Sequence, residues 1–310
     1  MASIPAFPAR EIMAYQPVYT PRVHRTRIRS LDYNLYLWGA DSAPAIYLMH
    51  GFADTAMSFQ FLAEQLADRW LVIAPDLQGF GESGWNARGY WFPDYLADLD
   101  AMLAEFSGNN PARLVGHSMG GNIVTHYAGI LPDRVSQLVT IDSFGLLETT
   151  PDQAPGRFAK WLLQWRDRPI FNEYEEQSAY VEIIRKRAPH ITPDRASFLA
   201  PYWSRKTESG KWTSRSDPNH RMLNPILYRR EEARACWRRV RAPTLLVLGA
   251  DSHTWSRYYE EWMREDFFPW FADLQEITIP ESGHMIHLDQ PELLARTLND
   301  FLSGQNIQRL

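Results

Sequence analysis

The chain has 310 residues, of which 45% are hydrophobic and 22% charged, a composition that excludes global disorder. The single cysteine, Cys236, excludes an intrachain disulfide and favours a cytoplasmic location. A net charge of −5 does not indicate a nucleic-acid partner, and no apolar run approaches the ~20 residues of a membrane helix. The first ten residues also lack the pattern of a signal peptide. From these features we expect neither a nucleic-acid partner nor stable membrane insertion.

Strand signals begin near the N-terminus. Alternating residues predict two antiparallel strands over 23–30 and 31–38. Short, nearly continuous apolar runs then recur along the chain, a pattern typical of parallel strands that are buried on both faces. These runs cover 46–49, 71–74, 113–115, 138–141, 244–248 and 276–279.

Amphipathic segments between these runs predict helices over 58–69, 93–106, 120–131 and 291–302. Strands that alternate with helices indicate an α/β protein with a mostly parallel, doubly wound sheet. From 147 to 241 the alternation stops: we expect helices at 157–165 and 173–187, a polar loop at 204–219, and no strand. The sequence therefore predicts a core from 1–146 and 241–310, with a helical insertion at 147–240.

The insertion differs in charge from the rest of the chain. It holds 18 Lys and Arg against 12 Asp and Glu, whereas the remainder holds 14 basic and 25 acidic residues. This shift predicts either a module with a distinct surface or simply ion pairs between the insertion and the core.

The segment that points most clearly to chemistry is Gly116-x-Ser118-x-Gly120, which follows one predicted strand and precedes one predicted helix. In this context a sharp turn lifts the serine hydroxyl above the edge of the sheet. The start of the next helix aims backbone N–H groups at the same place. We therefore expect Ser118 to be a nucleophile.

A second loop supports this interpretation. The backbone N–H of Phe52, which follows the strand at 46–49, is expected to pair with that of Met119 as an oxyanion hole. His50 is expected to orient this loop. The glycine-rich segment 76–83 is assigned a structural role.

The general base is expected to be His284, in the loop that follows the last predicted strand, where ligand sites form in open α/β sheets. His287 is the rival. His284, His287 and Asp289 do not match a metal-binding pattern, so we expect no metal and no cofactor.

Together these segments resemble the α/β-hydrolase superfamily, from about residue 22 to 303. The motifs His-Gly, Asp-x-x-Gly-x-Gly-x-Ser, Gly-His-Ser-Met-Gly-Gly and Gly-His…Gln-Pro-Glu occur in the order of that superfamily. The segments 50–59, 141–147 and 210–217 are similar to its serine-hydrolase-like (Kraken-type) branch. The resemblance implies that the insertion is a helical cap, or lid.

The acid of a catalytic triad has two candidates in the order Ser…Asp/Glu…His. The family's usual pattern after the strand at 244–248 is Gly-x-x-Asp, but here Asp251 comes one residue early and Ser252 takes the usual place. Some relatives with Gly-x-x-Ser-x-x-x-Ser, a form that 249–256 fits, use an acid at the end of an earlier strand. Asp142 lies there, and we favour it, with Asp251 as the alternative.

These residues predict a serine hydrolase that cleaves a small to medium hydrophobic carboxylester through an acyl-enzyme on Ser118. A lactonase, thioesterase, amidase or carbon–carbon bond hydrolase would use the same triad. A receptor that binds a small molecule without turnover is the alternative of another class. The protein is expected to be a monomer or a homodimer.

Overall fold

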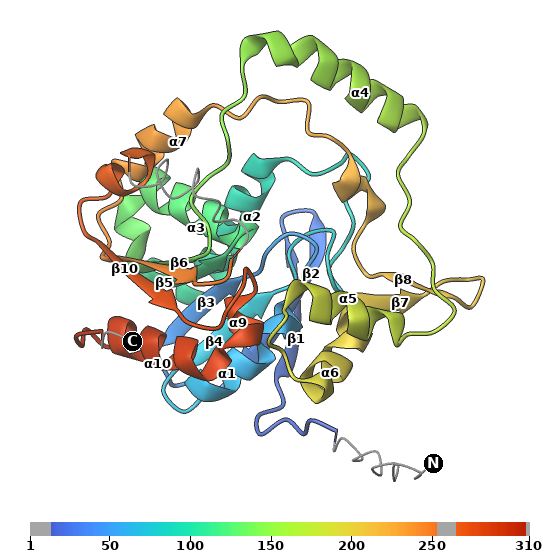
Figure 1. Cartoon of the computed structure of the whole chain (residues 1–310). Coiled ribbons are helices and arrows are strands. Elements are labelled where there is room, and N and C mark those ends of the chain that lie inside the picture. The colour runs from blue at the N-terminus through green and yellow to red at the C-terminus, as the bar shows by residue number, and fades with distance from the viewer. Residues whose placement is uncertain (1–13, 253–264, 308–310) are drawn as a thin grey trace, which may run out of the picture.

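The computed structural model describes residues 14–252 and 265–307. Its main feature is an eight-stranded sheet in the order β1-β2-β4-β3-β5-β6-β9-β10 (Figure 1). β1 and β2 pair antiparallel, as do β2 and β4, and the other neighbours are parallel, so the predicted α/β architecture is confirmed. The strands are β1 (Arg22–Ile28), β2 (Leu31–Trp38), β3 (Ala45–Met49), β4 (Leu71–Pro75), β5 (Ala112–His117), β6 (Val135–Ile141), β9 (Thr244–Gly249) and β10 (Leu274–Ile279).

The sheet is covered on both faces, because successive side chains of each strand point to opposite sides. In β9, Leu245 and Val247 belong to one apolar cluster, whereas Leu246 and Leu248 belong to another. The first cluster includes α1 (Gln60–Leu66), α9 (Ile286–Asp289) and α10 (Pro291–Leu302). The second includes α2 (Phe92–Ser107), α3 (Met119–Ile130) and α7 (Arg230–Trp237). The carboxyl ends of the parallel strands remain free to carry loops.

The chain between β6 and β9 forms the insertion. It contains α4 (Ala154–Arg166), α5 (Ala179–Arg187), α6 (Pro193–Trp203) and α7. α4 lies apart from the sheet and has no buried residue, whereas α5 and α6 pack near the start of α1 (Figure 1). α7 packs on α3, where Trp237 is fully buried.

Two expectations for the insertion are wrong. The segment 204–219 is not only a polar loop, because it contains a hairpin of β7 (Ser204–Lys206) and β8 (Trp212–Ser214). Gly210, with φ +86°, permits its tight turn. The helix expected at 173–187 begins only at Ala179, because Tyr174 instead exchanges backbone hydrogen bonds of 2.8 Å with Trp212. Strands of three residues are too short for periodicity to detect.

Within the described part of the chain, no helix has the length and apolar character required to cross a membrane.

Candidate active site

Ser118 lies in the sharp turn between β5 and α3. Its φ of +51° is a left-handed value that non-glycine residues rarely adopt. The flanking glycines permit this turn: a Cβ on Gly120 would lie 2.1 Å from the carbonyl oxygen of Met49, and one on Gly116 would lie 2.3 Å from that of Gly120. The geometry therefore places the Ser118 side chain at the carboxyl end of the sheet, directly before the N-terminus of α3.

His284 and Asp142 meet at the same edge. Asp142 follows β6 and is buried, and its Oδ2 accepts a hydrogen bond from Nδ1 of His284 in the loop after β10. The same oxygen accepts a second hydrogen bond, of 2.7 Å, from the hydroxyl of Ser252. Because Nδ1 donates its proton to the carboxylate, Nε2 of His284 carries the free lone pair.

Asp251 does not take part in this contact. Its side chain is 59% exposed, and its carboxylate lies 3.4 Å from Nε2 of His190. The buried Ser252 takes the inward position and contacts Asp142 instead. Of the segment 249–256, residues 253–256 lie outside the described residues.

The loop that holds Phe52 is fixed from two sides. His50 accepts a hydrogen bond of 2.9 Å from the N–H of Leu77 at Nε2, and its Nδ1 donates to the carbonyl of Gly51. Arg187 of α5 donates to the carbonyls of Phe52, at 3.1 Å, and Ala53. Both contacts restrict the peptide planes of this loop. Sequence reasoning did not anticipate Arg187, since nothing near it in the chain marks it.

Met119 is the first residue of α3. Its N–H therefore lies among the donors at a helix start that have no partner in the preceding turn. A Cβ on Gly51 would lie 3.2 Å from Cβ of Ser118, so the loop that carries Phe52 runs against the turn that holds Ser118.

His117 is buried beside His284, with their ring centroids 4.7 Å apart. Its Nε2 donates to the carbonyl of His284 at 2.8 Å, and burial holds the pKa of its imidazole well below the usual value. Ligand atoms of Asp54, His117 and His287 all lie within 4.8 Å of one another in the interior. Two imidazoles and a carboxylate form a donor set that Zn²⁺ accepts.

This group differs from the three residues considered in the sequence. Asp289 accepts the N–H groups of Gly283 and His190, at 2.8 and 3.0 Å, whereas Asp54 lies 3.5 Å from His287. Asp54 lies in the segment 50–59, but its separation of 233 residues from His287 hid the contact.

The segment 76–83 makes internal contacts. The buried Asp76 accepts hydrogen bonds from the N–H groups of Ala56 and Glu82 and from Asn34 Nδ2, at 2.9, 3.0 and 3.2 Å. Burial raises the pKa of this carboxyl to about 7. Asp76 therefore ties together the loops after β3 and β4.

Comparison with known proteins agrees with this fold. The sequence profile of the alpha/beta hydrolase fold family matches residues 44–291, and the chain belongs to this family. It is 25% identical to a serine hydrolase-like protein of Danio rerio, over 87% of this chain and 85% of that protein. It is 27% identical to a 3-hydroxybutyrate-oligomer hydrolase of Cupriavidus necator, over 83% of this chain and 88% of that protein.

Among solved structures, a hypothetical protein of Pseudomonas aeruginosa PAO1 is similar, with a TM-score of 0.79 and 28% identity. The match covers 91% of this chain and 99% of that one. The eight-stranded, mostly parallel sheet is thus that of the alpha/beta hydrolase fold.

Proposed function

We propose that this chain is a serine hydrolase that cleaves small to medium hydrophobic carboxylesters. The observation that carries the proposal is the hydrogen bond from His284 Nδ1 to the buried Asp142, beside the strained turn that holds Ser118. This is the relation between base and acid that a Ser-His-Asp triad requires.

The reaction follows from these positions. Ser118 Oγ attacks the ester carbonyl while Nε2 of His284 takes its proton, and the Asp142 carboxylate stabilises the resulting imidazolium. The N–H groups of Phe52 and Met119 stabilise the oxyanion. The imidazolium then returns the proton to the departing alkoxide, which leaves an acyl group on the serine.

Deacylation repeats these steps with water. Nε2 takes a proton from the water that attacks the acyl group, and the proton passes to Ser118 Oγ when the carboxylic acid leaves. The insertion at 147–240 serves as the cap. Its contact with the Phe52 loop, through Arg187, supports this role.

Two measurements test the proposal. A fluorophosphonate should add once to the wild-type protein, as seen by intact mass, and not at all to Ser118→Ala. Ser197→Ala is the matched control, because this serine is exposed and donates a hydrogen bond to the carbonyl of Pro193 within α6. A panel of an ester, a lactone, a thioester and an amide then ranks the bond types. A folded wild-type protein without an adduct, or an adduct that persists in Ser118→Ala, would overturn the proposal.

A further inference from the structure

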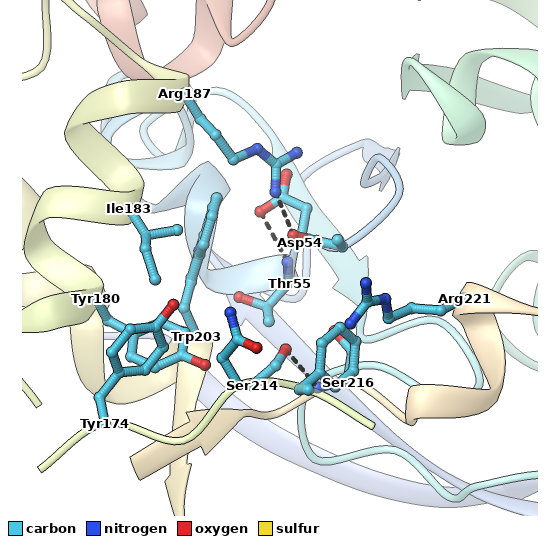
Figure 2. A pocket seen from close by; sticks show the side chains of 13 residues that line it. Asp54, Thr55, Tyr174, Tyr180, Ile183, Arg187, Trp203, Ser214, Ser216 and Arg221 are labelled. Carbon is cyan, nitrogen blue, oxygen red and sulfur yellow. Dashed lines mark hydrogen bonds between the residues drawn. The ribbon is translucent and has the colours of Figure 1, made fainter. Parts of the chain in front are cut away.

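A cavity of about 200 Å³ lies between the insertion and the loop after β3 (Figure 2). This is smaller than the roughly 300–1,000 Å³ of pockets for drug-sized ligands, so it suits a small group. Its walls come from α5, α6, β8 and the segment Ala53–Thr55. It is therefore formed jointly by the insertion and the core.

Two guanidinium groups line this cavity. Arg187 extends from α5, and Arg221 extends from the short helix Pro218–Arg221 (Figure 2). No ion pair within 4.0 Å joins either of them to a carboxylate in residues 14–252 and 265–307, although Asp54 attracts Arg187 electrostatically. Arg187 donates hydrogen bonds to the carbonyls of Phe52 and Ala53 and to Sδ of Met285, and Arg221 donates to the carbonyl of Ile170. Burial lowers the pKa of Arg187 from its usual value, the effect expected of a cation poorly served by water.

Asp54 is the acidic residue among those that line the cavity, and its carboxylate is already engaged. Oδ1 accepts the N–H of Thr55, at 2.8 Å, and the hydroxyl of Ser58. Oδ2 faces Nε2 of His287 at 3.5 Å. Two cations against one carboxylate leave the lining with a net positive charge.

The remaining walls are largely aromatic. Tyr174 and Tyr180 meet edge to face with ring centroids 5.8 Å apart, and Arg187 lies over the ring of Trp203 at 4.8 Å. Phe171 lies 5.7 Å from the guanidinium carbon of Arg221. Such walls favour an apolar chain, whereas the guanidinium groups favour an anion at its end, since arginine matches the planar geometry of a carboxylate.

The cavity is close to the reacting serine. Ala53, part of its wall, is two residues from Gly51, where a Cβ would lie 3.2 Å from Cβ of Ser118. The loop 51–53 thus links Ser118 to the cavity wall, and Arg187, which lines the cavity, donates hydrogen bonds to the carbonyls of Phe52 and Ala53 in this loop.

We infer that the substrate carries a carboxylate at the end of its acyl chain, held by Arg187 and Arg221. This inference rests on the proposed function, because it assigns a substrate class to the same site. It predicts that a monoester of a dicarboxylic acid is a better substrate than the neutral ester of equal chain length.

The test compares the mono-p-nitrophenyl ester of adipic acid with p-nitrophenyl hexanoate, which differs only in its uncharged chain end. The ratio of kcat/KM for adipate over hexanoate should exceed one in the wild type and fall about tenfold to a hundredfold in Arg221→Gln, since a charge-assisted hydrogen bond contributes that much. Arg185→Gln is the matched control. It removes the same charge from the exposed face of α5, where Arg185 pairs with Glu182, and should leave the ratio within about twofold.

A binding measurement separates this inference from the proposed function. In Ser118→Ala, calorimetric titration should show monomethyl adipate binding more tightly than dimethyl adipate, and adding Arg221→Gln should abolish the preference. This result is independent of turnover, so it holds even if no ester is cleaved and no fluorophosphonate adduct forms. Equal binding of the two esters, or an unchanged preference in Arg221→Gln, would overturn the inference while leaving the ester hydrolase proposal intact.

Discussion

Replacing Asp142 by asparagine should remove most of the activity while keeping the fold. The side chain is fully buried, so water cannot take the place of the lost charge. An asparagine of the same shape can still accept the Ser252 hydroxyl, but it cannot stabilise an imidazolium at His284, and its amide group can present N–H to Nδ1. The imidazole would then carry its proton on Nε2, where it cannot take one from Ser118.

The expected loss is about 10⁴-fold in kcat, the size measured for the same change in a serine protease triad, which corresponds to about 5 kcal/mol of transition-state stabilisation. The assay is ester hydrolysis by purified protein, with circular dichroism to confirm folding. Asp251→Asn is the control and should stay within about twofold of wild type, since its carboxylate is 59% exposed and contacts only His190 among the described residues. An inactive Asp251→Asn, or an Asp142→Asn that keeps more than a tenth of the activity, would refute this reasoning.

Two further predictions concern stability. Gly120→Ala should lower the free energy of unfolding by about 1–3 kcal/mol or more in urea denaturation, because its Cβ would lie 2.1 Å from the Met49 carbonyl. Gly156→Ala, in open space on α4, should instead raise the free energy of unfolding by up to about 1 kcal/mol. Equal effects of the two substitutions would contradict the packing argument. The ring of His220 stacks on that of Tyr90, with the ring centroids 3.6 Å apart. Burial lowers the pKa of His220 from 6.5 to about 3. The contribution of the neutral His220 to stability is thus present above pH 6.5 and is lost as the pH falls towards 3. Between pH 8 and pH 5 the free energy of unfolding should therefore fall by about 2 kcal/mol more in the wild type than in His220→Phe. Parallel pH profiles of the two proteins would show that His220 does not cause the loss of stability.

The core of the fold could be predicted from sequence because a strand that is buried on both faces consists of a continuous run of apolar residues. Each of the six apolar runs is a strand, and the helix expected at 291–302 is α10 with the same bounds. The hairpin of β7 and β8 has no comparable sequence pattern, since its strands are three residues long and the bridge from Trp212 to Tyr174 spans 38 positions. The late start of α5 has the same cause.

At the candidate site, too, local sequence patterns could be predicted and long-range contacts could not. The Ser118 turn was evident from two glycines at fixed spacing, whereas the choice between Asp142 and Asp251 depended on one residue of offset after β9. In the structure, the N–H of Asp251 donates to the carbonyl of Ser282, and this turn directs Ser252 inward. Arg187 could not be found, because its contact with Phe52 joins segments 135 residues apart.

Near the candidate site, three non-glycine residues adopt left-handed backbone conformations that lower the stability of the fold. Ser118, Asp142 and Ala53 have φ values of +51°, +47° and +52°, and each such conformation costs about 1–3 kcal/mol in a non-glycine residue. Selection for thermal stability alone should therefore favour glycine at these three positions. At Ala53 the exchange removes only a methyl group, but at Ser118 and Asp142 it removes the proposed nucleophile and acid. A thermostable variant obtained without an activity screen would be enriched in inactive protein at these two positions.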